Sequence, residues 1–196
     1  ITVSSISIGP ITRHSFTIAR ASAGPGVKNL IGMDLLSAHR CHFCFDEQRV
    51  VVDPDAVSDG SLAFEPLFLD PRLHPYVDVR FGDVVARAVW DTGASITVVD
   101  SSVIDSHPAL FTQAGQSTGT DAAGAQMETG MFVMSAAQIG GHLFMPHRVA
   151  AVDLSRLNAT LDVPMHLILG YSTLRQARWL FDFPGRKWAV SRWLGA

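Results

Sequence analysis

The chain has 196 residues, 47% of them hydrophobic and 17% charged, with a formal net charge of -3. This composition is typical of a globular protein that is long enough to bury a substantial core, and it argues against disorder. The small negative charge argues against nucleic acid as the main partner, and no apolar run approaches the roughly 18–20 residues that span a bilayer.

The first 54 residues contain the elements of half a β-rich lobe. Two strand-like stretches flank a tight turn at Gly9, and a short helix is predicted after the apolar-apolar-Gly element that ends at Gly32. A final hairpin is predicted around a turn at Asp46-Glu47-Gln48.

The two cysteines, Cys41 and Cys44, lie beside two histidines in the sequence HRCHFCF. Such spacing can indicate a metal or redox site. However, Phe43 and Phe45 alternate with polar or small residues as in a strand, which places the two cysteines on opposite faces. We therefore expect structural cysteines, no metal site and no cofactor.

Residues 55-75 are rich in Pro and Asp, which predicts a linker between two lobes. Five apolar residues indicate that this linker packs on a surface: Leu62, Phe64, Leu67, Phe68 and Leu69. The boundary is placed near Pro71 to Pro75, so that residues 76-196 form the next lobe.

The second lobe begins with three predicted strands within residues 76–102. Buried and wet positions alternate from Val77 to Phe81, and a hairpin turn at Gly82 leads the chain back toward an Asp-Thr-Gly turn at residues 91–93. Residues 102–114 are predicted to form a loop with a short helical turn. A mobile β-hairpin is predicted where small residues lie between two strand-like arms: Gly119, Ala122, Ala123, Gly124 and Ala125.

An internal repeat relates the two ends of the chain. Residues 29–52 align without a gap on residues 167–190 when Gly32 is placed on Gly170, and Phe43 then aligns with Phe181. In each copy the sequence predicts, in this order, a strand, a tight Gly turn, a second strand, an apolar-apolar-Gly element, a short helix and a final hairpin. The chain therefore contains the C-terminal half of a first lobe, residues 1-54, and a complete second lobe.

The order Asp-Thr-Gly, mobile hairpin and Ile168-Leu169-Gly170 resembles aspartic proteases of the pepsin and retropepsin families, from about Tyr76 to Trp193. The resemblance implies an all-β fold of acid-protease β-barrel lobes, with short helices and a β-hairpin flap over the substrate. Two features depart from the pepsin-like pattern. No tyrosine lies between Ser95 and Ile139, and Ala94 follows the glycine, as in many retropepsins.

The resemblance assigns roles to single residues. Asp91 is one catalytic carboxylate, Thr92 bonds across to the opposite loop, and Gly93 brings its N–H to the carboxylate. Ser95 supports the loop by a local hydrogen bond. The flap residues expected to contact substrate are Gly119, Thr120, Asp121, Ala122, Ala123 and Gly124. The histidines His142, His147 and His166 are predicted to lie on the surface.

Aspartic proteolysis needs two carboxylates that share a proton. The second Asp is expected on the part of the first lobe that precedes this sequence, or at Asp91 of a second chain in a homodimer. The repeat favours the first, because a half-lobe in cis occupies the surface that a symmetric partner needs. A third hypothesis is an inactive fold that binds peptides or proteins through its cleft. The sequence leaves the compartment open, with a lean toward an extracytoplasmic or secreted location.

Overall fold

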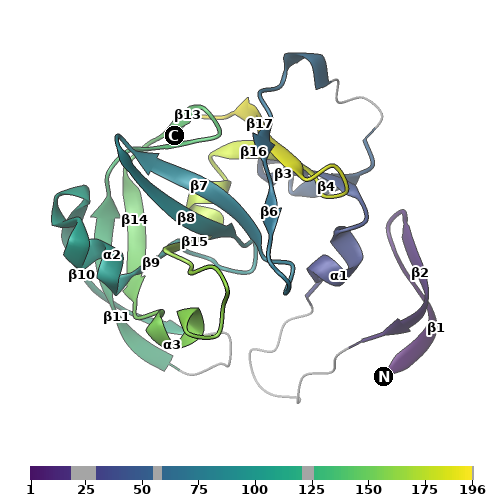
Figure 1. The fold of residues 1–196 in the computed structure, drawn as a ribbon, viewed down its shortest axis with the longest axis horizontal. Coiled ribbons are helices and arrows are strands. Elements are labelled where there is room, and N and C mark those ends of the chain that lie inside the picture. Colours follow the sequence, from purple (N-terminus) through teal and green to yellow (C-terminus); the bar gives the residue numbers. More distant parts are fainter. Residues whose placement is uncertain (19–29, 55–58, 121–125, 196) are drawn as a thin grey trace.

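The computed structural model describes residues 1–18, 30–54, 59–120 and 126–195. Strands dominate these residues, and the α-helices are short (Figure 1). Within the described ranges, no helix is long and apolar enough to cross a membrane. The strands form three sheets, which confirms the all-β prediction.

The largest sheet has the order β10-β11-β14-β9-β15-β8-β7-β12-β13, with β6 added beside β7. This path is open at both ends. Its strands are β6 (Phe68–Leu69), β7 (Pro75–Phe81), β8 (Val84–Trp90), β9 (Val98–Asp100), β10 (Phe111–Thr120), β11 (Gln126–Met134), β12 (Ala137–Ile139), β13 (His142–Phe144), β14 (His147–Val152) and β15 (Leu167–Leu169). The three strands predicted within residues 76–102 are therefore present, as β7, β8 and β9.

The β7–β8 hairpin follows the alternation in its sequence. Val77, Val79 and Phe81 are buried, whereas Arg80 between them is exposed. Gly82 turns the chain with a φ of +59, a left-handed conformation that glycine adopts without steric cost. Burial on one face of this hairpin positions the end of β8, where the Asp-Thr-Gly turn begins.

The segment after β9 was predicted as a loop with a short helical turn over residues 102–114, and it contains helical turns as far as Leu110. Helix α2 (Ser101–Ser106) begins with the Asp100 side chain accepting a hydrogen bond from the Ser102 N–H, and a 3-10 turn follows at Pro108–Leu110. Strand β10 already starts at Phe111, so the loop prediction was wrong for residues 111–114. Phe111 is buried, and its ring lies 6.2 Å from the Phe81 ring. This packing favours a strand even though the residues that follow Phe111 are polar.

The second sheet joins the two copies of the repeat in the order β4-β3-β16-β17-β5. Its strands are β3 (Arg40–Cys44), β4 (Arg49–Val52), β5 (Glu65–Pro66), β16 (Ala177–Asp182) and β17 (Lys187–Trp193). The hairpin β3–β4 pairs Cys41 with Val52, and β16–β17 pairs the aligned residues Trp179 and Val190. The two copies of the sequence repeat therefore form hairpins in which aligned residues pair in the same register.

Aligned helices and turns complete the correspondence. Helix α1 (Met33–Leu36) is capped by Gly32, and α4 (Tyr171–Leu174) by the aligned Gly170. Strands β3 and β16 are antiparallel, and His42 pairs with its own counterpart, Leu180. A local two-fold axis therefore passes between His42 and Leu180 and relates one hairpin to the other.

Strands β1 (Thr2–Ile8) and β2 (Ile11–Thr17) form a separate two-stranded sheet. The hairpin turns at Gly9 with a φ of +55, as β12–β13 does at Gly140 with the same φ. Residues 55-75 were predicted to form a linker. In its described part, β5 pairs with β17, β6 pairs with β7, and Leu67 is buried. Leu67 therefore packs as expected, whereas Phe68 is 45% exposed, and the division into lobes stays a prediction.

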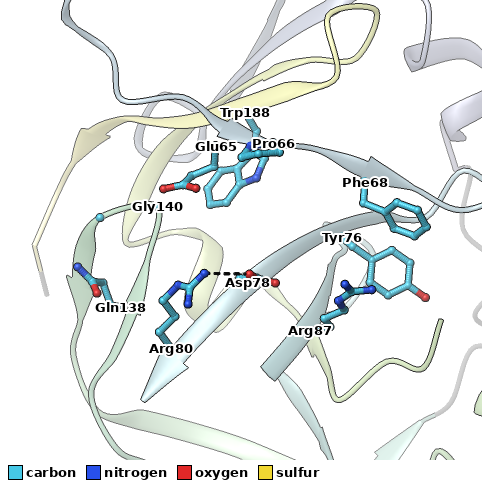
Figure 2. Close-up of a pocket in the computed structure, with 11 residues that line it drawn as sticks. Glu65, Pro66, Phe68, Tyr76, Asp78, Arg80, Arg87, Gln138, Gly140 and Trp188 are labelled. Carbon is cyan, nitrogen blue, oxygen red and sulfur yellow. Dashed lines mark hydrogen bonds and ion pairs between the residues drawn. The ribbon is translucent and has the colours of Figure 1, made fainter. Parts of the chain in front are cut away.

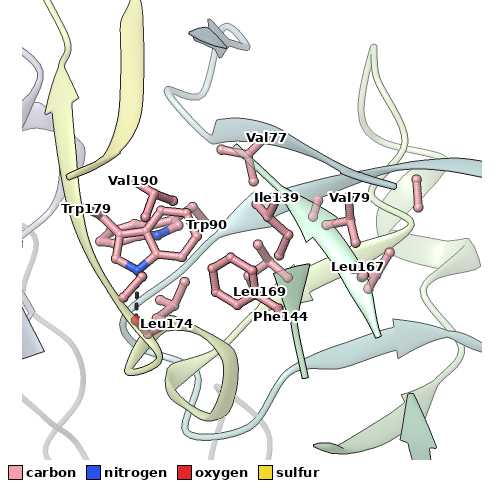
Figure 3. Close-up of a cluster of buried hydrophobic side chains, with 14 of the residues drawn as sticks. Val77, Val79, Trp90, Ile139, Phe144, Leu167, Leu169, Leu174, Trp179 and Val190 are labelled. Atoms are coloured by element: carbon pink, nitrogen blue, oxygen red, sulfur yellow. Dashed lines mark hydrogen bonds between the residues drawn. The ribbon is translucent and has the colours of Figure 1, made fainter. Parts of the chain in front are cut away.

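The core contains both aliphatic and aromatic side chains, and the Trp90 and Trp179 rings lie 6.2 Å apart within it (Figure 3). The Trp90 ring at the end of β8 lies 4.5 Å from the Phe43 ring of β3 and 4.7 Å from the Phe181 ring of β16, so these three strands pack together.

Strand β3 ends at Cys44, and Phe45, which was predicted in that strand, instead begins a 3-10 helix. The two cysteines are free and buried.

Candidate active site

Asp91 follows β8 directly and is held at two points. Its backbone N–H donates to the Leu169 carbonyl at 3.0 Å. Its carboxylate Oδ1 accepts the Gly93 N–H at 2.7 Å, as expected from the sequence. Within the described chain, no other group bonds this carboxylate, and the side chain is partly exposed. The turn therefore presents one oriented carboxylate with its second oxygen open.

Strand β15 supports the loop from inside the sheet. It lies between β8, to which it is parallel, and β9, to which it is antiparallel. Gly170 ends this strand so close to the loop that a β-carbon there would lie 2.3 Å from the Ile96 carbonyl oxygen. Tyr171 then donates its N–H to the Ala94 carbonyl at 2.8 Å. The apolar-apolar-Gly element thus packs against the Asp-Thr-Gly turn.

A chain of side-chain hydrogen bonds lies beneath this contact. Thr97, at the end of the loop, accepts the Gly170 N–H at 3.0 Å. Its hydroxyl is 2.6 Å from that of Thr173, which is 2.7 Å from Nε2 of His147. Thr97 and Thr173 have no exposed surface. Sequence reasoning missed both threonines.

His147 was predicted to lie on the surface, and the structure corrects this. The ring is partly buried on β14, and removal from water lowers its pKa below 6.5. The buried Gln176 also reaches it, with Nε2 3.4 Å from Nδ1. Because β14 pairs with β9, the fold carries this histidine under the loop that holds Asp91. No local spacing in the sequence signals that contact.

Thr92 and Ser95 lie on the exposed side of the loop. Neither side chain makes a hydrogen bond within the described residues, so neither shows the partner that the resemblance assigns to it. The Thr92 bond across to an opposite loop and the local bond of Ser95 remain predictions.

Strands β10 and β11 form the predicted hairpin as a long antiparallel pair. Gly119 pairs with Met127, and Thr120 with Gln126, at the far end of the two arms. The predicted substrate-contacting residues Asp121, Ala122, Ala123 and Gly124 fall outside the described residues. A bulge between Gln113 and Gln116, where Gly115 has a φ of +97, interrupts the pairing nearer the base.

A surface pocket of about 450 Å³ lies elsewhere, on the polar side of β7 (Figure 2). Asp78 and Arg80 face each other there at 3.1 Å, and the Phe68 ring lies 5.6 Å from that of Tyr76. Its lining includes no residue of the Asp91 loop. In the part of the chain that is described, no group of three or more His, Cys, Asp or Glu side chains could hold a metal ion.

The geometry of the loop, strand β15 and hairpin agrees with a comparison with known families. Residues 77–173 match the family model described as Aspartyl protease, a segment that begins in β7 and ends in α4. This segment, 97 of the 196 residues, is similar to aspartyl proteases, as the resemblance in its sequence predicts.

Among solved structures, the chain is similar to the crystal structure of the retroviral protease-like domain of Ddi1 from Leishmania major, at 19% identity and a TM-score of 0.37. The alignment covers 53% of this chain and 77% of that chain. No curated protein matches the sequence.

Proposed function

We propose that this chain contributes Asp91 to the active site of an aspartic endopeptidase. The observation that carries the proposal is the fixed position of this carboxylate. The Gly93 N–H holds one of its oxygens, and β15 holds the backbone beneath it. The hydrogen bond from Gly93 alone is common in turns, so the support from β15 is what distinguishes this carboxylate.

The reaction uses two carboxylates and one water. The ionised carboxylate takes a proton from the water, whose oxygen bonds to the carbon of the peptide carbonyl. The protonated carboxylate gives its proton to the carbonyl oxygen, which forms a tetrahedral intermediate. Its collapse breaks the C–N bond: the first carboxyl group gives the proton taken from water to the leaving nitrogen, and the second takes back a proton from a hydroxyl of the intermediate. Asp91 fills one of these two roles, with the oxygen that Gly93 does not bind facing the water.

The local two-fold axis between His42 and Leu180 supports a second carboxylate on the first-lobe side of the molecule. It relates α1 to α4, so the counterpart of the Asp91 loop belongs beside Gly32, as Asp91 lies beside Gly170. Leu30 and Ile31 precede Gly32 and are 80% and 51% exposed, whereas Leu169, the counterpart of Ile31, is fully buried. These exposed apolar residues fit a first-lobe segment that covers them and carries the second Asp.

Experiments can distinguish this two-lobed arrangement from two alternatives, a homodimer and an inactive fold. A second chain could supply its own Asp91, although β3, β4 and α1 occupy the side of the local axis that a symmetric copy needs. An inactive fold could bind peptides in the same cleft without cleaving them. In each arrangement the ligand is a peptide or protein, and the β10–β11 hairpin is the element that covers it.

The Asp91→Asn variant tests the proposal in a chain that includes the first-lobe segment. The amide keeps the shape and the Gly93 hydrogen bond but cannot take a proton from water. Hydrolysis of a denatured-protein substrate should disappear, while the melting temperature stays close to that of wild type. Asp83→Asn, in the exposed turn between β7 and β8, is the matched control and should keep full activity. Equal activity in wild type and Asp91→Asn would contradict the assignment.

A further inference from the structure

The hydrogen bonds that link the Met145 carbonyl, His147, Thr173, Thr97 and Gly170 can share one direction. The Gln176 amide nitrogen, at 3.4 Å from Nδ1, cannot donate to a protonated Nδ1 and lies outside this chain of bonds. The Met145 carbonyl lies 2.8 Å from Nδ1 of His147, and a carbonyl only accepts, so Nδ1 carries a proton. In a neutral ring, Nε2 then accepts from the hydroxyl of Thr173. The single hydroxyl proton of Thr173 is used in this bond, so Thr173 can only accept from the Thr97 hydroxyl. The Thr97 oxygen in turn accepts the Gly170 N–H.

Protonation of His147 forces this chain to reverse. Nε2 becomes a donor to Thr173, so the Thr173 proton must turn toward Thr97. The Thr97 oxygen already accepts from Gly170 and, at 3.3 Å, from Ser172. Its own proton then loses the 2.6 Å contact with Thr173 and can turn to the Ser172 hydroxyl oxygen at 3.3 Å, so a short hydrogen bond is exchanged for a longer and weaker one.

We propose that His147 is a positioning residue for the Asp91 loop, with its neutral ring as the terminal acceptor of the chain that holds Gly170 to Thr97. Protonation of the ring loosens this contact and withdraws support from the loop. The inference rests on the proposed function for its effect on catalysis. The hydrogen-bond chain itself is independent of that function.

The surroundings of the ring favour its neutral form. Burial is the largest cause of its lowered pKa, and the charge of Arg175, just after α4, lowers the pKa further. The Met145 carbonyl acts in the opposite direction. Among the described residues, Arg175 is the charged side chain that acts on this ring, and its neighbours Thr173 and Gln176 are uncharged. From β11, the residue paired with His147 is Met134.

The His147→Gln variant separates positioning from packing. A glutamine oxygen can accept from Thr173 as Nε2 does, and it stays uncharged at every pH. His142→Gln is the matched control, because His142 is a partly exposed histidine on β13 that takes no part in the chain. His147→Leu removes the acceptor altogether.

The first measurement is the pH dependence of the backbone amide resonances of Gly170 and Ala94, from about pH 7.5 to 5, the range in which histidine titrates. In wild type and His142→Gln, these resonances should move together with the His147 ring. In His147→Gln they should stay fixed. Movement of the same size in His147→Gln, or none in wild type, would overturn the proposal.

The second measurement is kcat/KM against pH in the enzyme that includes the first-lobe segment. Wild type should lose about tenfold per pH unit below the pKa of His147, the rate at which the neutral ring disappears. His147→Gln should lack this loss, whereas His147→Leu should be impaired at every pH. An unchanged acid limb in His147→Gln would contradict the catalytic effect. If no variant cleaves peptides, the proposed function fails, and the amide resonances still decide the role of His147.

Discussion

Gly170 touches the backbone at Ile96 so closely that no larger residue fits between them. A β-carbon at Gly170 would be 2.3 Å from the Ile96 carbonyl oxygen and 2.8 Å from that of Ala94. Both atoms belong to the loop that carries Asp91, and neither is a flexible side-chain end. The φ of Gly170 is -95, which any residue can adopt, so the requirement for glycine is steric.

Gly170→Ala should therefore displace the loop and destabilise the fold. Overpacking of a rigid interior typically costs about 1–3 kcal/mol, and backbone neighbours place this site at the upper end. The free energy of unfolding, measured by denaturant titration, should fall by that amount. Gly119→Ala is the control for stability, because its nearest neighbour would be Thr129 Oγ1 at 3.8 Å. Equal stability of the two variants would show that the loop can move away at little cost.

The sequence was sufficient for the features that depend on local pattern or on self-similarity. Alternating burial predicted β7 and β8, and the ungapped repeat predicted a final hairpin in each copy. The structure adds that the two hairpins pair in the same register. The pairing of His42 with Leu180 could not be predicted, because alignment of two segments does not show that they lie side by side. The start of β10 at Phe111 was also missed, since its burial depends on the distant Phe81.

The support beneath the active site was missed for a related reason. Thr97 and Thr173 are 76 residues apart, and their bond exists only because β15 enters between β8 and β9. A threonine in a sequence is equally compatible with a strand surface or a loop, and a lone histidine is more often exposed. Only the three-dimensional contact gives these residues a role.

Leu30→Glu should abolish activity without unfolding this chain. Leu30 is 80% exposed here, so a charge costs little, but the same charge would be buried beneath the proposed first-lobe segment. Peptide hydrolysis by the longer protein should disappear. Leu143→Glu is the control: Leu143 is 58% exposed on β13, and its substitution should preserve activity. Full activity of Leu30→Glu would contradict the proposed covering of this residue.

Arg178 should make stability dependent on pH in the acid range. Its guanidinium donates to both oxygens of Asp46, from Nε at 2.9 and 3.1 Å and from Nη2 at 2.6 Å, and it also bonds Glu47. These hydrogen bonds hold the pKa of Asp46 below its ordinary value of 3.8. A carboxyl with a lowered folded-state pKa stabilises the fold above its unfolded pKa, and this contribution disappears as pH falls through the folded value.

Arg178→Gln should therefore lower the melting temperature at neutral pH, and the difference from wild type should shrink as pH falls below 3.8. Added salt should reduce the difference less than it would for an isolated surface pair, because the Arg178 side chain is only 15% exposed. Arg80→Gln, which breaks an exposed pair with Asp78, is the comparison and should have little effect at any pH. A difference that stays constant from neutral pH to below 3.8 would show that Arg178 acts through packing alone.

Cys41 and Cys44 should react with a thiol reagent only after the fold opens. Burial raises the pKa of Cys41 to about 12, and it also raises the pKa of Cys44. The thiolate is the reactive form, so both residues are protected by protonation as well as by exclusion of the reagent. A disulfide-exchange reagent at mildly alkaline pH should label no cysteine in the native protein and two in denaturant. The rate of native labelling should follow the rate of unfolding, and Cys44→Ser should reduce the final count by one. Rapid labelling of one thiol in the native protein would show that the five-stranded sheet opens locally at β3.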